Sequence, residues 1–119
     1  MTERNDITIY HNPHCSNSRG ALALLRERGI EPRIVEYVKD PLTAAQLRAL
    51  VAQVGTPVRE LMRSKEDAYQ QLGLGDASVG DEALIAAIAE HPKLLNRPIV
   101  VTPKGAALCR PPERVLDLL

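Results

Sequence analysis

Cys15 lies in a polar segment whose residue types suit nucleophilic thiol chemistry. The segment His11-Asn-Pro-His-Cys-Ser-Asn-Ser-Arg19 follows a short apolar run and leads into a predicted helix over 16–28. Free N–H groups and the dipole at a helix N-terminus favour a thiolate, and they also bind anions. Such positions lower a cysteine pKa from about 8.5 to roughly 3.5–7.5. We therefore expect Cys15 to attack an oxyanion, with a buried, unreactive cysteine as the alternative.

The residues around Cys15 offer further polar groups. His11 could add positive charge or a hydrogen bond, and Ser16 to Ser18 supply short polar side chains and backbone donors. Position 18 is serine, so the turn has no Cys-x-x-Cys pair, and we expect an adduct on Cys15 to be resolved by an external thiol. Cys109 lies in an apolar strand, where packing is the expected role, although a Cys15–Cys109 disulfide stays open.

Arginine outnumbers lysine by eleven to four, which suits planar, bidentate recognition of oxyanions. Most of these arginines are expected on solvated helix faces. Arg63 ends a short predicted helix, while Arg97 and Arg110 each precede a proline at the end of a loop next to a strand. Loop ends on a rigid sheet commonly hold functional side chains, which is the position expected for Arg97 and Arg110. All three arginines stand out by context as candidate anion ligands.

Composition limits the classes of function. The chain has 119 residues, 45% of them hydrophobic, and its 15 basic residues balance 15 acidic ones. This balance argues against binding to nucleic acid by bulk charge. The sequence has no visible secretory signal or membrane span and only two cysteines, so we expect a cytoplasmic protein with reduced thiols. We expect no bound metal or resident cofactor.

The predicted elements follow the order β-α-β, a helical block, then β-β-α. Strands are expected at 7–10 and 33–38 around the first helix. The helical block, about 43–95, contains a helix that starts at the N-cap Thr43 and an alanine-rich helix over 81–90. A hairpin of strands 99–101 and 106–109 and a last helix over 113–119 complete the chain. We expect a single α/β domain over residues 1–119, with a four-stranded mixed sheet of thioredoxin-like (glutaredoxin-like) plan and a helical insertion.

Several motifs together resemble the glutaredoxin-linked arsenate reductase (ArsC) family over nearly the whole chain. Ser16-Asn17 stands where arsenate reductases tend to have Gly-Thr, so the chain resembles a Cys-Ser-x-Ser branch of that family. The matching segments are Tyr10-His-Asn-Pro-His-Cys15, Ser18-Arg19, Arg59-Glu-Leu-Met-Arg63, His91-Pro92, Asn96-Arg-Pro-Ile-Val-Val-Thr-Pro103 and Cys109-Arg-Pro111.

The resemblance implies roles for individual residues. Cys15 matches the nucleophile, and His11 matches the histidine that lowers its pKa. Arg63, Arg97 and Arg110 match the arginines that bind the oxyanion and its thiol adduct. Pro98 matches a cis proline opposite the active-site turn. Asn12 and Ser18 of the motif are further expected substrate contacts.

The implied reaction reduces arsenate to arsenite. The Cys15 thiolate attacks arsenate, glutathione displaces the cysteine from arsenic, and glutaredoxin reduces the product. Two alternatives stay open. One is a thiol-disulfide oxidoreductase that acts on glutathione adducts. The other is a regulator resembling Spx that binds RNA polymerase, which the serine at position 18 disfavours because Spx-type switches commonly use a Cys-x-x-Cys pair.

Overall fold

The computed structural model describes residues 2–119 as two compact units. Among the described residues, the first unit comprises 2–40 and Arg97–Leu119, and the second comprises Pro41–Asn96. The second unit therefore covers the segment in which the sequence predicts a helical block. Within residues 2–119, no helix is both long enough and apolar enough to cross a membrane.

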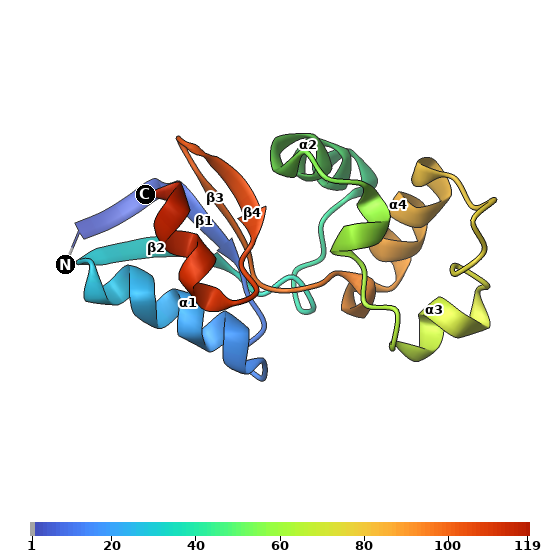
Figure 1. Ribbon diagram of the computed structural model, residues 1–119, viewed down its shortest axis with the longest axis horizontal. Helices are drawn as coiled ribbons and strands as arrows, with labels where there is room; N and C mark the ends of the chain where they lie inside the picture. Colours follow the sequence, from blue (N-terminus) through green and yellow to red (C-terminus); the bar gives the residue numbers. More distant parts are fainter. Residues whose placement is uncertain (1) are drawn as a thin grey trace. The chain divides into compact units, whose positions relative to one another are not determined.

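The first unit contains a four-stranded mixed sheet with the strand order β2-β1-β3-β4 (Figure 1). Strands β1 (Thr2–Tyr10) and β2 (Ile30–Val35) are parallel, as their connection through a helix requires. Strands β3 (Ile99–Thr102) and β4 (Gly105–Leu108) form the predicted antiparallel hairpin, and β3 also pairs with β1. The predicted fold class is confirmed.

The bounds of the second strand were predicted wrongly. We expected residues 33–38, whereas β2 covers Ile30–Val35 and includes Pro32. Proline is tolerated there because β2 is an edge strand, so one row of its N–H groups needs no partner. Residues 36–40 form a turn instead, in which the N–H groups of Lys39 and Asp40 donate to the Glu36 carbonyl.

Helix α1 (Ser16–Glu27) covers one face of the sheet with its apolar side. A buried cluster of β-strand, α1 and C-terminal residues forms the core of this unit: Ile7, Ile9, Ala21, Leu22, Leu25, Val100, Cys109 and Val115. The predicted last helix is a 3₁₀ helix, η3 (Pro112–Leu118), which packs against α1. This core fixes the start of α1 against the carboxyl end of β1, where Cys15 lies.

The second unit is helical. It contains α2 (Ala44–Val54), η1 (Val58–Leu61), α3 (Asp67–Gln71), α4 (Asp81–Glu90) and η2 (Pro92–Leu94). Thr43 starts α2 with a capping box: the Thr43 side chain accepts from the Gln46 N–H, and the Gln46 side-chain oxygen accepts from the Thr43 N–H. Arg59 holds the loop before α4 by donating to the carbonyls of Leu74, Asp76 and Val79.

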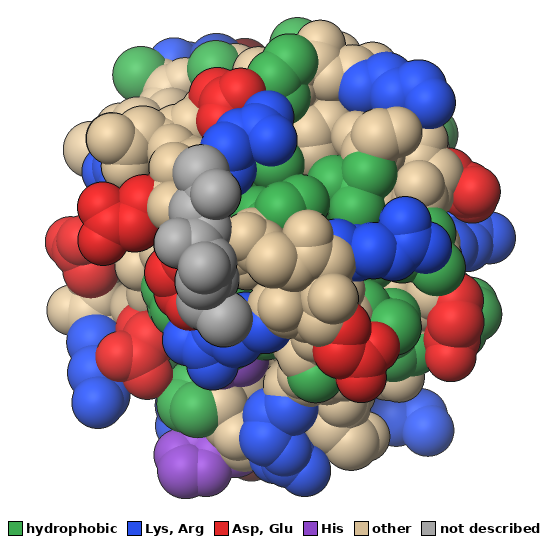
Figure 2. Space-filling view, turned by 90° about the vertical axis from the view of Figure 1, so that its left-hand side faces the viewer, with side chains coloured by type: hydrophobic (Ala, Val, Ile, Leu, Met, Phe, Trp, Pro, Cys, Tyr) green, Lys and Arg blue, Asp and Glu red, His purple; other side chains and the backbone are tan. Residues whose placement is uncertain are grey.

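The face on the side of the N-terminus shows apolar side chains among charged ones of both signs (Figure 2). A cavity of about 200 Å³ at the amino end of β1 is lined by Ile7, Ile30 and Leu118, with Arg4 and Lys104 also on its wall. Because Cys15 follows the other end of β1, this cavity is separate from the candidate active site.

Candidate active site

Cys15 is the N-cap residue of α1, with an extended backbone (φ −98°, ψ 124°). Its N–H donates to the Asn12 carbonyl at 3.0 Å, and its own carbonyl accepts from the Arg19 N–H at 3.0 Å. The first turn of α1 has no acidic side chain, so no carboxylate of the helix competes for its positive end. The sulfur therefore sits where an anion is favoured.

Two guanidinium groups of the first unit face the sulfur. Nη1 of Arg110 lies 3.7 Å from Cys15 Sγ and also donates to the Arg97 carbonyl at 3.0 Å. Arg97 acts on Cys15 through its charge and through a hydrogen bond. The peptide bonds Arg97–Pro98 and Arg110–Pro111 are both cis, and the resemblance implied a cis proline at Pro98. The sequence separates these arginines from Cys15 by more than 80 residues, and the sheet brings them together.

The pKa of Cys15 is lowered from its ordinary value. Burial, which leaves 7% of the residue exposed, is the largest single influence and raises the pKa. The Ser18 N–H, the charge and hydrogen bond of Arg97, and the Asn17 N–H together outweigh it. The N–H groups at the helix end and the nearby guanidinium therefore favour the thiolate.

His11 contacts the hydroxyl group of Ser18. Its Nδ1 lies 2.6 Å from Ser18 Oγ, and the same hydroxyl accepts from the Asn12 N–H at 3.0 Å. Burial lowers the pKa of His11, with Arg26 and Arg19 adding to this and Glu36 opposing it, so the ring is neutral at neutral pH. The hydrogen bond of the ring goes to Ser18, and a role of His11 at the thiol stays a prediction.

The turn before Cys15 is built by its own polar groups. The Asn12 side-chain oxygen accepts from the His14 N–H at 2.9 Å, and the His11 N–H donates to the Val35 carbonyl of β2 at 2.8 Å. Ser18 is fully buried, so its hydroxyl serves the turn and its N–H is the group offered to the sulfur. Direct substrate contacts by Asn12 and Ser18 stay predictions.

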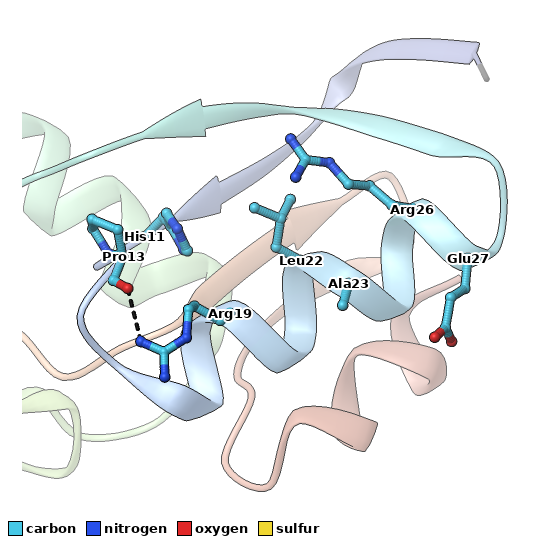
Figure 3. A pocket seen from close by; sticks show the side chains of 7 residues that line it. All are labelled: His11, Pro13, Arg19, Leu22, Ala23, Arg26 and Glu27. Atoms are coloured by element: carbon cyan, nitrogen blue, oxygen red, sulfur yellow. Dashed lines mark hydrogen bonds between the residues drawn. The ribbon is translucent and has the colours of Figure 1, made fainter.

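A groove of about 620 Å³ runs along α1 from this turn (Figure 3). His11 and Pro13 line one end, and Arg19 and Arg26 line its length. Arg19 donates to the Pro13 carbonyl at 2.9 Å, and Arg26 makes a two-point contact with the Glu31 carboxylate at 2.8 and 3.2 Å. Both arginines of the groove are thus bound to acceptors within the protein, whereas Arg97 and Arg110 face Cys15.

Known proteins share this arrangement of sequence and fold. The family model described as "ArsC family" matches residues 10–118. The chain belongs to the ArsC family. It is 53% identical over 113 residues to "Arsenate reductase" of Rhizobium meliloti, covering 95% of this chain and 81% of the relative. It is 51% identical over 114 residues to "Uncharacterized protein YfgD" of Escherichia coli, covering 95% and 96%.

The solved structure titled "Arsenate reductase from Vibrio cholerae" has the same fold, with a TM-score of 0.91 and 49% identity, and covers 95% of this chain and 97% of that one. This ArsC-family chain thus places Cys15, Arg97 and Arg110 together within its first unit. Arg63 belongs to the second unit, where its Nη1 donates to Glu66 Oε2 at 2.9 Å and its N–H to the Leu94 carbonyl at 2.8 Å.

Cys109 is packed in the core of this ArsC-family chain. It is fully buried, both cysteines are free thiols, and burial raises the pKa of Cys109 to about 12. The packing role expected from the sequence agrees with this position. Since Cys109 has no exposed surface, it cannot serve as a second thiol for substrate unless the fold opens.

The buried Cys109 thiol is expected to make the protein less stable at alkaline pH. The unfolded thiol ionises near pH 8.5, whereas the folded one resists ionisation up to about pH 12. Its contribution to the free energy of unfolding is therefore complete below pH 8.5 and falls as the pH rises toward 12. Denaturant unfolding from pH 7 to 11 gives the free energies of unfolding of the wild type and of Cys109→Ala. The difference between these two free energies should shrink as the pH rises. A difference independent of pH would contradict the position of this thiol.

Removing the Ser18 hydroxyl should destabilise the active-site turn. Ser18→Ala leaves the buried Nδ1 of His11 and the Asn12 N–H without this partner, which costs about 1–3 kcal/mol. Urea unfolding should show this loss, while Ser16→Ala, an exposed serine on the same helix, should stay within about 0.5 kcal/mol of the wild type. Equal stability of the two variants would refute the turn's dependence on that hydroxyl.

Proposed function

We propose that this protein is an arsenate reductase in which the Cys15 thiolate attacks arsenate. The observation that carries the proposal is the sulfur at the start of α1, facing the guanidinium groups of Arg97 and Arg110. Arsenate is a phosphate-like dianion near neutral pH and repels an approaching thiolate. Guanidinium and N–H donors offset this repulsion and stabilise charge in the transition state. Relatives named arsenate reductase, at 46–53% identity, support arsenate as the oxyanion.

The proposed reaction balances with glutathione as the electron donor. Cys15 forms a sulfur–arsenic bond, and one arsenate oxygen leaves as water after taking up two protons. The thiol of glutathione then displaces Cys15 from arsenic, which regenerates the Cys15 thiol and leaves arsenic(V) bound to glutathione. A glutaredoxin thiol attacks the sulfur of this adduct, the sulfur–arsenic bond breaks with its electron pair staying on arsenic, and arsenic(III) leaves as arsenite. The net reaction converts one arsenate and two glutathione molecules into arsenite, water and glutathione disulfide. The mixed disulfide that forms between glutaredoxin and the first glutathione is reduced by the second glutathione, which yields the glutathione disulfide.

The need for an external thiol follows from the positions of the cysteines. Position 18 is serine, and the other cysteine, Cys109, is fully buried. Cys15 therefore lacks an accessible partner thiol within residues 2–119 of its own chain. Glutathione is the abundant thiol of the cytosol, so we place the reaction in the cytoplasm, with no resident cofactor. Ser16 and Ser18 fit the proposed Cys-Ser-x-Ser branch of the family.

The remaining site residues are proposed from the resemblance as well as from the geometry. Arg97 and Arg110 bind the oxyanion and its adduct, and Arg63 is proposed as the third such arginine on the resemblance alone. His11 orients Ser18, whose N–H favours the thiolate. We further propose that the two compact units act as one functional domain over residues 1–119, with the helical block as an insertion.

A coupled assay tests this function. Purified protein is incubated with arsenate, glutathione, glutaredoxin, glutathione reductase and NADPH, and the expected result is arsenate-dependent NADPH oxidation with arsenite as product. NADPH oxidation equal to that of the coupling enzymes alone would refute arsenate reduction. A second assay replaces arsenate with a glutathionylated peptide and tests the alternative function. Turnover of the peptide without turnover of arsenate would identify a thiol-disulfide oxidoreductase.

A further inference from the structure

Gly20 occupies a costly position for its residue type. It lies inside α1, where glycine is less favourable than alanine by roughly 0.5–1 kcal/mol. A Cβ atom at this position would lie 3.0 Å from Cγ and 3.2 Å from Cβ of Pro112. The missing side chain therefore lets the start of η3 approach α1 more closely than an alanine would allow.

The segment that makes this approach also carries Arg110. Cys109, fully buried, holds one end and donates its N–H to the Pro98 carbonyl at 2.8 Å. Val115, also fully buried, holds the other end. The intervening Pro111 and Pro112 have ring-restricted φ angles, so they transmit a shift rather than absorb it. We expect a displacement of Pro112 to reach Arg110, two residues away.

The position of Arg110 matters because its guanidinium joins two parts of the site. Nη1 contacts Cys15 Sγ at 3.7 Å and the Arg97 carbonyl at 3.0 Å. The contact with the sulfur is long and the one with the carbonyl has an ordinary length, and the exposed Arg110 side chain makes both. A shift of a few tenths of an ångström in the Arg110 backbone therefore weakens them.

We propose that Gly20 is a positioning residue, which seats Pro112 against α1 and thereby places the Arg110 guanidinium on Cys15. The proposal deepens the proposed function, since it names a residue that controls the oxyanion site without touching it. It does not depend on arsenate being the substrate, because the contact between Arg110 and Cys15 exists without any ligand.

The test is a double-mutant cycle read on Cys15 itself. Gly20→Ala and Arg110→Ala are each expected to raise the pKa of Cys15, measured as the pH dependence of its alkylation rate, and to weaken its protection by arsenate several-fold. The double variant should be no worse than Arg110→Ala alone. Gly80→Ala is the matched control, because an added Cβ there meets nothing within 4 Å, and it should leave both readouts unchanged.

A relief variant guards against a folding defect. Pro112→Ala removes the Cγ atom that lies nearest to the added methyl, so combining it with Gly20→Ala should return part of the pKa shift, or restore folding if Gly20→Ala alone does not fold. A Gly20→Ala protein with the alkylation profile of the wild type would overturn the proposal. Effects that add to those of Arg110→Ala, or a relief variant that restores nothing, would also overturn it. Failure of arsenate turnover with the expected alkylation results would count against the proposed function only.

Discussion

Replacing Cys15 with serine is expected to remove arsenate-dependent NADPH oxidation, with a loss of at least about 10³-fold in kcat. A serine hydroxyl is far less acidic than the Cys15 thiol. Burial raises the pKa of this thiol, but the Ser18 N–H and Arg97 outweigh burial and lower it. It therefore supplies almost no anion to attack arsenic at neutral pH. The measurement is the coupled assay at saturating glutathione, with arsenate varied.

Cys109→Ala is the matched control for this variant. It also removes one thiol, but from the buried core of the first unit, so it should keep a kcat within about threefold of the wild type once its folding is verified. Turnover by Cys15→Ser above about a tenth of the wild-type rate would contradict a nucleophilic role for Cys15. Loss of turnover in Cys109→Ala but not in Cys15→Ser would indicate that Cys109 is the nucleophile.

Arg97→Ala is expected to have the second largest effect, lowering kcat/KM by about 10²- to 10³-fold, as the loss of one preorganised donor to developing charge does elsewhere. Arg97 lowers the pKa of Cys15 through its charge and a hydrogen bond, so the variant should also show a higher Cys15 pKa. The pH at which alkylation reaches half its maximal rate should rise accordingly. Arg97→Lys keeps the charge but not the planar donor pair, so its kcat/KM and its Cys15 pKa should lie between those of the wild type and of Arg97→Ala.

Arg33→Ala provides the control for a general loss of positive charge. Arg33 is exposed on β2, whereas Arg97 and Arg110 face the Cys15 sulfur. Its removal should leave kcat/KM and the Cys15 pKa within about twofold and a few tenths of a pH unit of the wild type. If Arg97→Ala and Arg33→Ala behave alike, Arg97 has no specific role at the sulfur.

The sequence predicted the sheet better than the ends of its strands. Hydrophobic runs and the Pro and Gly residues between them indicated a βαβ half, a helical block and a ββα half, and the mixed sheet follows from that order. β2 starts at Ile30, whereas the prediction began the second strand at residue 33, directly after Pro32. Its tolerance depends on β2 being an edge strand, a tertiary fact that no local pattern contains.

The candidate site was predictable in part. A cysteine after a turn and before a helix signals a low pKa, and arginines at loop ends next to strands signal anion binding. Pattern alone made Arg63, Arg97 and Arg110 candidate ligands, and the sheet brings Arg97 and Arg110 to Cys15.

Two contacts of the site escaped the sequence analysis. The link between His11 and Ser18 spans seven residues and depends on the turn geometry, so spacing could not reveal it. The approach of Gly20 to Pro112 joins distant segments, and its one local trace was a glycine inside a predicted helix.

The pKa of Cys15, measured by the pH dependence of its alkylation with and without arsenate, tests the central claim most directly. The buried Cys109 thiol, with a pKa of about 12, does not interfere with this titration. We predict a Cys15 pKa below about 8.5 and slower alkylation when arsenate is bound. A pKa at or above that of free cysteine, with no protection by arsenate, would contradict a thiolate held by Arg97, Arg110 and the start of α1.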